Sequence, residues 1–180
     1  MTEPLPPDLN AEPILDTLRR HAVDFVVIGG IAGIAHGSSY PTYDLDVAYS
    51  RESSNLERLA DALRDLDARL RTPGDETDLP FQLDARSLET GANFTFLTRF
   101  GSFDVLADPG GIRSYEELRA TAQDVVLEGI PVKVASLDHL IAMKRTAARS
   151  KDMIMLEEYI ALADEQRRIG EPRGDSQGPR

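Results

Sequence analysis

Short apolar runs alternate with amphipathic stretches along this chain, and their spacing predicts its elements. Apolar residues at helical spacing predict helices, and compact β-branched or alternating runs predict strands. In the first half, the predicted helices are Ala11–Arg20, residues 31–36 ended by Gly37, and residues 53–70 capped by Ser53 or Ser54. The predicted strands there are residues 24–28 and 43–49, and residues 72–80 read as a polar loop.

The second half of the chain shows hairpins followed by helices. Residues 94–100 and 103–107 flank Gly101-Ser102, residues 125–127 and 131–134 flank Glu128-Gly129, and helices are expected at 136–148 and 152–163. Hairpins rather than repeated crossovers favour an α+β fold. We expect a mixed or antiparallel central sheet flanked by helices, with further helices at the C-terminal end.

Composition fits one domain. The chain has 180 residues, of which 41% are hydrophobic, enough for a single core. We expect flexible or disordered tails at 1–10 and 170–180 around a domain at 11–169, with a core at 24–134 and a helical part at 136–165. The lack of cysteine excludes disulfides and thiolate metal sites. No stretch has the length or apolarity of a membrane span or secretory signal, which predicts a cytoplasmic protein without membrane contact.

Charge narrows the list of partners. A net charge of -11 counts against broad, sequence-independent binding to nucleic acid. The strongest local basic run lies at 144–151, where Lys144, Arg145, Arg149 and Lys151 fall within eight residues. The same pattern is also typical of a solvated helix face.

Asp44 and Asp46 are the first candidates for chemistry. Two positions apart on a predicted strand, their carboxylates project from one face and repel each other. Hard divalent cations such as Mg²⁺ prefer carboxylate oxygens and would relieve that repulsion. A lone pair of this kind is also common in turns, so its surroundings decide.

Two neighbouring features support a metal and phosphate site. The junction from strand to helix at Gly29-Gly30 aims backbone N–H groups outward, as a phosphate site requires, although an ordinary turn looks the same. Asp104 lies inside an apolar run and needs a partner, which a shared metal or a hydrogen bond would supply. Asp108, before Pro109-Gly110-Gly111, reads as a turn residue.

The order of these pieces between residues 24 and 107 resembles the polymerase-β-like nucleotidyltransferase superfamily. The resemblance implies two ions, Mg²⁺ or Mn²⁺, held by Asp44 and Asp46, with Asp104 sharing the catalytic ion and helping to deprotonate the acceptor hydroxyl. Transfer at an α-phosphate with loss of pyrophosphate would follow.

Within that group the chain is most similar to small AbiEii-type nucleotidyltransferases, several of which are toxins of toxin-antitoxin pairs. The matching stretches are residues 27–30, 36–37, 42–47, 140–144 and 149–152. The family usually has arginine where this chain has Tyr40, which bears on the triphosphate contacts. The resemblance implies an antitoxin protein as a possible partner.

A further set of residues is assigned to nucleotide binding. It consists of Gly29, Gly30, Ser38, Ser39, Thr42, Lys144 and Lys151. Lys144 and Lys151 lie about two helical turns apart and would face one cleft if the helix continues. Asp152 fits this motif or a helix cap equally well.

The sequence therefore predicts an enzyme that transfers a nucleoside monophosphate from a nucleoside triphosphate to a hydroxyl of RNA or tRNA, a protein or a small molecule. Two alternatives stay open. Tyr40 favours a non-catalytic member that binds nucleotide or a partner protein. The acidic charge favours an aminoglycoside-type small-molecule transferase with a cationic acceptor.

Overall fold

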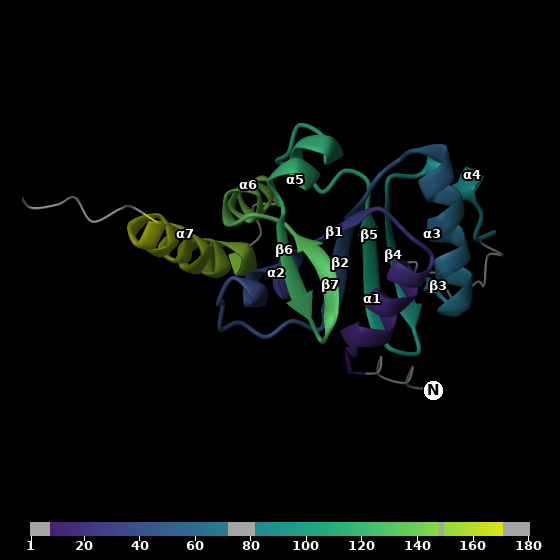
Figure 1. The fold of residues 1–180 in the computed structure, drawn as a ribbon, viewed down its shortest axis with the longest axis horizontal. Coiled ribbons are helices and arrows are strands. Elements are labelled where there is room, and N and C mark those ends of the chain that lie inside the picture. The colour runs from purple at the N-terminus through teal and green to yellow at the C-terminus, as the bar shows by residue number, and fades with distance from the viewer. Residues whose placement is uncertain (1–7, 72–81, 148–149, 171–180) are drawn as a thin grey trace, which may run out of the picture.

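A seven-stranded sheet runs through the molecule (Figure 1). The computed structural model describes residues 8–71, 82–147 and 150–170, apart from the side chains of residues 150–152. The strands are β1 (Phe25–Ile28), β2 (Asp44–Tyr49), β3 (Arg69–Leu70), β4 (Asn93–Thr98), β5 (Gly101–Leu106), β6 (Gln123–Leu127) and β7 (Ile130–Val134). Their order across the sheet is β3-β4-β5-β2-β1-β7-β6.

The sheet is mixed. β2 pairs parallel with β5 and antiparallel with β1, while β1 pairs parallel with β7. The β4-β5 and β6-β7 hairpins are antiparallel, as the sequence predicts. The predicted α+β class with a mixed sheet is confirmed.

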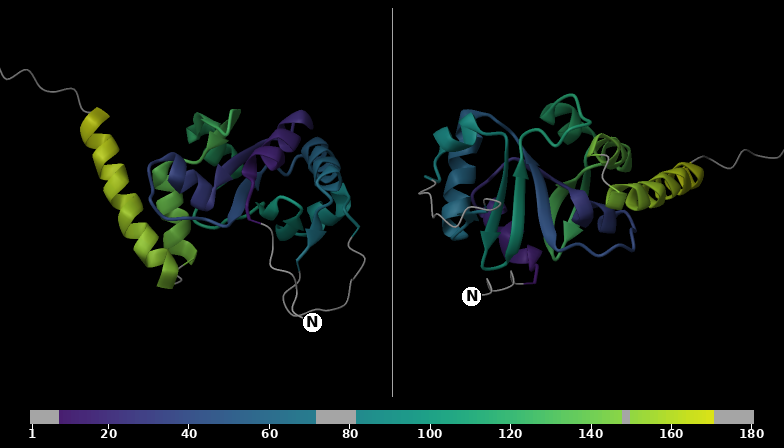
Figure 2. Two further views of the ribbon diagram at one scale, coloured as in Figure 1. Left: turned by 90° about the horizontal axis from the view of Figure 1, so that it is seen from below. Right: turned by 180° about the vertical axis from the view of Figure 1, so that it is seen from behind.

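Helices cover the sheet unevenly (Figures 1 and 2). They are α1 (Ala11–Arg20), α2 (Gly29–Ala35), α3 (Ser53–Asp65), α4 (Ala85–Thr90), α5 (Tyr115–Thr121), α6 (Leu137–Ala147) and α7 (Ser150–Gly170). α1 and α3 pack together on one face, and α2 and α6 pack together on the other. α7 packs on α6 and extends away from the sheet.

The two faces of the sheet differ in polarity. Under α1 and α3, alternate strand residues such as Val47, Phe96 and Phe103 are fully buried and contribute to one apolar core. Burying each large apolar side chain stabilises the fold by roughly 1.5–3 kcal/mol. On the opposite face, Ser102 and Asp104 of β5 are only partly buried. The view from behind shows β4 and β5 without a described helix in front of them (Figure 2, right).

Several predicted boundaries are wrong. The hairpin turn expected at Gly101-Ser102 lies at residues 99–100, and Gly101 and Ser102 are the first residues of β5. The helix expected at 53–70 ends at Asp65, and Asp67 adopts a positive φ of 50° that turns the chain back. Leu70 then pairs with Phe96 as part of β3 rather than continuing the helical row. The expected serine cap is also wrong, because Glu52 occupies the N-cap position and makes no side-chain capping bond.

Two short helices were not predicted. α4 begins where the Asp84 carboxylate accepts a bond from the Ser87 amide at 2.8 Å, and α5 begins where the Ser114 hydroxyl accepts one from the Glu117 amide at 3.2 Å. Such caps are the local signal that short helices offer. The last helix reaches Gly170, beyond the predicted end at residue 163.

The predicted loop at 72–80 lies outside the described residues, as do residues 1–7 and 171–180 of the predicted tails. Over the part of the chain that the structure covers, no helix combines the length and apolarity needed to span a bilayer.

Candidate metal and nucleotide site

Three carboxylates meet where β2 and β5 lie side by side. Asp44 and Asp46 project from one face of β2, and parallel pairing places Asp104 of β5 directly beside Asp46. One carboxylate oxygen from each lies within 4.8 Å of the others. Among the described residues this is the group of acidic or imidazole side chains that is arranged to hold a metal ion. We call Asp44, Asp46 and Asp104 the acidic triad.

Burial and mutual repulsion disfavour the charged forms of Asp46 and Asp104 in the acidic triad. Burial, with repulsion by Asp44 and Asp104, raises the pKa of Asp46 to about 7, although Lys144 and a bond from the Gly30 amide oppose the rise. Burial also raises the pKa of Asp104, and the Thr95 side chain beside it partly offsets this.

One oxygen of the acidic triad has no hydrogen-bond partner among the residues that the structure describes. Asp104 Oδ1 is buried and makes no hydrogen bond within the described part of the chain. A buried, unpartnered carboxylate oxygen is costly unless a cation or donor approaches it. The donor set is all oxygen, as hard divalent ions prefer. The residues therefore fit Mg²⁺ or Mn²⁺.

Gly29 and Gly30 make room for the acidic triad. A Cβ on Gly29 would lie 2.0 Å from Asp46 Oδ2, and one on Gly30 would lie 2.5 Å from Thr42 Oγ1. Gly29 also has a φ of +64°, which favours glycine. The sequence predicted a tight turn here, whereas both glycines open α2. The Gly30 amide is already bonded to Asp46.

Thr42 has a contact that the sequence did not indicate. Its hydroxyl donates to Asp44 Oδ1 at 2.9 Å. Thr42 therefore orients one carboxylate of the acidic triad, whereas the sequence assigned it to nucleotide binding.

Ser38 and Ser39 are bonded to a carboxylate from α7. Ser38 Oγ donates to Glu158 Oε2 at 2.5 Å, and the Ser39 amide and hydroxyl donate to Glu158 Oε1 at 3.0 and 2.9 Å. These bonds, Ser38 first, lower the pKa of Glu158. In this arrangement the donors predicted to bind phosphate hold α7 in place. No sequence pattern distinguished Glu158 from its neighbours.

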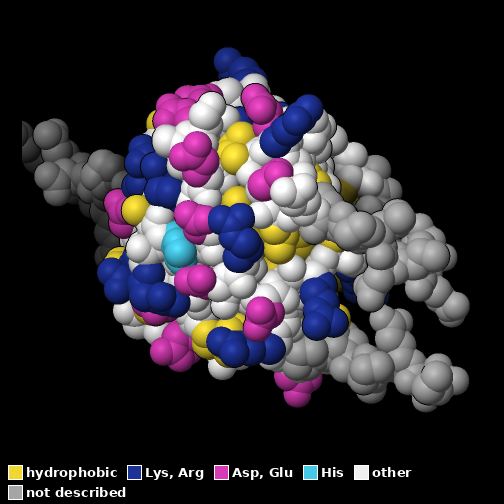
Figure 3. Space-filling model, turned by 90° about the vertical axis from the view of Figure 1, so that its right-hand side faces the viewer, with side chains coloured by type: hydrophobic (Ala, Val, Ile, Leu, Met, Phe, Trp, Pro, Cys, Tyr) yellow, Lys and Arg dark blue, Asp and Glu magenta, His cyan; other side chains and the backbone are white. Residues whose placement is uncertain are grey.

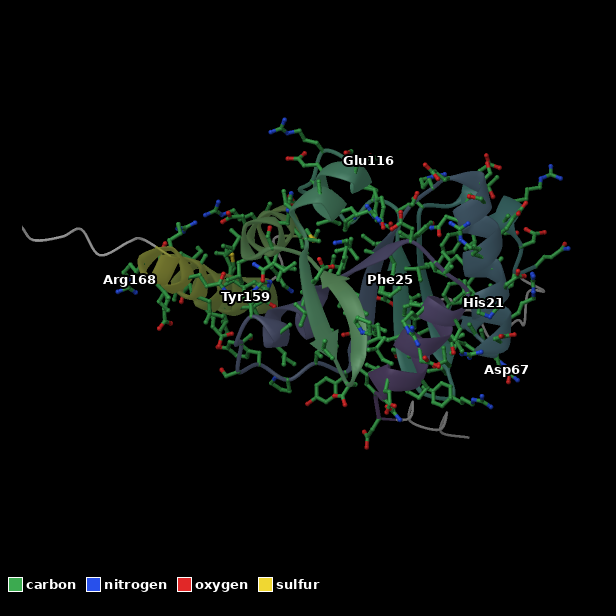
Figure 4. All side chains as sticks on the ribbon, viewed as in Figure 1. His21, Phe25, Asp67, Glu116, Tyr159 and Arg168 are labelled. Atoms are coloured by element: carbon green, nitrogen blue, oxygen red, sulfur yellow. The ribbon has the colours of Figure 1, made fainter. Side chains whose placement is uncertain are left out.

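A second contact seats α7 beside α2. Tyr159 lies where α7 passes α2 (Figure 4), and a Cβ on Gly33 would lie 2.2 Å from its hydroxyl oxygen. The Glu158 bonds and the Tyr159 contact together fix α7 against the segment that leads to the acidic triad.

The structure describes the side chain of only one of the two predicted cationic residues, Lys144 and Lys151. Lys144, on α6, lies close enough to the acidic triad to lower the pKa of Asp46. Lys151 belongs to α7, but its side chain lies outside the described residues, as does that of Asp152. Asp108 accepts a bond from the Gly110 amide at 3.1 Å, so its prediction as a turn residue is confirmed.

Arg71 and Thr95 are additional neighbours of Asp104. Thr95 pairs with Asp104 across β4 and β5, and Arg71 lowers the pKa of Asp104 through its charge. Neither residue was predicted from the sequence, because their place beside the acidic triad depends on strand pairing.

Comparison with solved structures identifies the fold. The lincosamide antibiotic adenylyltransferase LnuA, bound to lincomycin, matches with a TM-score of 0.58 at 11% identity, over 87% of this chain and 99% of LnuA. ANT(2'')-Ia in complex with adenylyl-2''-tobramycin matches at 0.51 and 16%, over 88% and 96%. An antigenic nucleotidyltransferase-like protein from Paracoccidioides brasiliensis matches at 0.52 and 12%, over 88% and 79%.

No protein-family model and no curated protein matches the chain. At identities of 11–16%, the likeness to solved structures establishes the architecture alone. The chain shares the fold of these solved nucleotidyltransferase structures, and Asp44, Asp46 and Asp104 form its candidate acidic triad.

Proposed function

We propose that the protein is a metal-dependent nucleotidyltransferase that moves a nucleoside monophosphate from a nucleoside triphosphate to an acceptor hydroxyl. The observation that carries this proposal is the acidic triad, whose oxygens lie within 4.8 Å of one another while Asp104 Oδ1 has no partner in the described chain. The shared fold supports it.

The acidic triad would hold the metal. Asp44 and Asp46 would ligate two ions, as the superfamily resemblance implies, and Asp104 would share one of them. Mg²⁺ or Mn²⁺, when bound, supplies positive charge to the phosphate oxygens and lowers the pKa of an acceptor hydroxyl.

The chain's own groups complete the site. The Asp104 carboxylate would take the acceptor proton as the bond from the acceptor oxygen to the α-phosphorus forms and the bond from the α-phosphorus to the bridging oxygen of the β-phosphate breaks. Lys144, whose charge acts on Asp46, would balance charge on the departing pyrophosphate. Thr42 keeps Asp44 oriented.

Some of the other proposed nucleotide contacts require existing hydrogen bonds to break first. Ser38 and Ser39 would bind phosphate only after release of Glu158, since their hydroxyls are engaged by it. The Gly29 backbone and Lys151 would bind the nucleotide as predicted from the sequence, and the Gly30 amide would do so only after it leaves Asp46.

The acceptor has three candidate classes: a small molecule, RNA or tRNA, and a protein. The similar structures carry lincomycin and adenylyl-2''-tobramycin, which favours a small molecule. RNA or tRNA, a protein acceptor and an antitoxin partner follow from the AbiEii-type resemblance alone. Tyr40 in place of the family arginine, together with the Glu158 bonds, supports the non-catalytic alternative.

Label position separates these possibilities. The purified protein would be incubated with Mg²⁺ or Mn²⁺ and each nucleoside triphosphate, labelled at the α- or γ-phosphate, with RNA, the protein itself and aminoglycosides as acceptors. A nucleotidyltransferase attaches the α-label and releases the γ-label as pyrophosphate. Attachment of the γ-label would indicate phosphoryl transfer instead. Nucleotide binding without release of either label would favour the non-catalytic alternative.

A further inference from the structure

The acidic triad lies at one end of a row of polar side chains that crosses four strands. Asp46 on β2 pairs with Asp104 on β5, which pairs with Thr95 on β4. Directly after β3, the Arg71 amide donates to the Thr95 carbonyl oxygen at 2.8 Å, extending the β3-β4 pairing by one residue. Paired residues share a face of the sheet. We call Asp46, Asp104, Thr95 and Arg71 the cross-strand row.

The cross-strand row lies on the face of the sheet that the described helices cover sparsely. Over β4 and β5 no described helix stands in front of it (Figure 2, right). Arg71 is exposed, and so is Arg69, which alternation places on the same face two positions earlier. Among the described residues neither arginine forms an ion pair, whereas Arg71 does act on Asp104 through its charge.

The positive groups stand on opposite sides of the acidic triad. Lys144 approaches Asp46 from α6, and Arg71 approaches Asp104 from the β3 edge. If Lys144 balances charge on the triphosphate, the β3 side is left for the acceptor. Neighbouring strands lie about 4.8 Å apart, so the Arg71 backbone is about 10 Å from that of Asp104. A molecule the size of a sugar phosphate spans that interval.

At the end of the molecule that carries α3, α4 and β3, the surface is not uniformly acidic, although the net charge of the chain is -11. Over the end that carries α3, α4 and β3, basic and acidic side chains are interspersed (Figure 3). The acidic net charge of -11 is therefore not concentrated on the face in view.

We propose that Arg71, with Arg69 beside it, binds an anionic group of the acceptor. The acceptor is then a hydroxyl compound that carries a phosphate or carboxylate, both of which match the planar donor fork of arginine. This inference rests on the proposed function for the identity of the bound molecule. It separates the protein from transferases of cationic antibiotics, because a polycation such as tobramycin would meet two arginines.

A matched set of sugars tests the proposal by NMR titration of the full chain with Mg²⁺ present. Glucose 6-phosphate, glucuronate, glucose and glucosamine share one ring and differ in charge. We expect the phosphate, the carboxylate or both to shift the amide signals of residues 69–71 and Thr95, while glucose and glucosamine do not. The stronger of the two anions identifies the group. Arg71→Gln should weaken binding about tenfold, whereas Arg113→Gln, a remote exposed arginine, should not.

Stronger shifts with glucosamine, no shift on β3 and β4 with either anion, or unchanged binding by a folded Arg71→Gln would overturn the proposal. The titration requires no turnover. It can therefore fail while label transfer succeeds, or succeed while transfer fails.

Discussion

Gly29 and Asp46 are packed so closely that the space between them has no room for a methyl group. A Cβ on Gly29 would lie 2.0 Å from Asp46 Oδ2 and 2.9 Å from its Cβ. The first residue of α2 thus sets the position of a central carboxylate of the acidic triad.

Gly29→Ala should therefore damage both the fold and the metal site. The positive φ and the clash with Asp46 should together lower the free energy of unfolding by about 2–4 kcal/mol. Gly129→Ala is the matched control, because Gly129 also has a positive φ, +80°, with nothing within 4 Å of its Cβ. Comparing the free energies of urea unfolding of the two variants separates the cost of the clash with Asp46 from the cost of the positive φ. Equal losses would show that Asp46 does not depend on Gly29.

Asp46→Asn should stabilise the metal-free protein at high pH. The folded pKa near 7 lies above the ordinary 3.8, so the folded state holds this proton more tightly and stability falls as pH rises between these values. The full difference corresponds to about 4 kcal/mol, and partial exposure reduces it to about 2 kcal/mol. The gain should be present above about pH 7 and vanish towards about pH 4. Urea titrations in EDTA measure it, and a gain that is independent of pH would contradict this account.

Divalent metal should stabilise the wild-type protein. At about a tenfold excess of Mg²⁺ over its dissociation constant, linkage gives about 1–2 kcal/mol, or several degrees in Tm. The shift should disappear in Asp44→Asn and Asp104→Asn. It should persist in Asp108→Asn, since Asp108 serves a turn. Differential scanning calorimetry provides the comparison, and equal shifts in all variants would place the ion elsewhere.

Glu158→Ala should loosen α7. The lost bonds to Ser38 and Ser39 should cost about 1–3 kcal/mol and speed amide exchange at residues 38–40. The lowered pKa of Glu158 means that its contribution is present above the ordinary value and is lost as pH falls below it. Glu157→Ala, at an exposed neighbouring position, is the control. Unchanged exchange at residues 38–40 would show that the bonds contribute nothing in solution.

Local patterns in the sequence predicted most of the architecture. Alternation placed Asp44 and Asp46 on one face of a strand, and an apolar run identified β5 around Asp104. The third carboxylate is brought to the pair by parallel pairing between strands more than fifty residues apart, which local patterns do not encode.

The errors in the prediction have physical causes. Leu70 continues the helical spacing of the preceding leucines, so a helix through it was the natural expectation. The positive φ of Asp67 breaks that row and creates β3. Because β3 was not predicted, the sequence did not indicate that Arg71 lies near Asp104. Glu158 was missed because its bonds to Ser38 and Ser39 cross about 120 residues of sequence.

The most direct test of the central claim is α-label transfer by wild type, the double variant Asp44→Asn with Asp46→Asn, and Asp108→Asn, with matched metal titrations. We predict metal-dependent transfer by wild type and Asp108→Asn. In the double variant, transfer should fall by at least about a hundredfold and metal binding should be lost. Transfer that survives in the double variant would contradict the assignment of the acidic triad as the catalytic site.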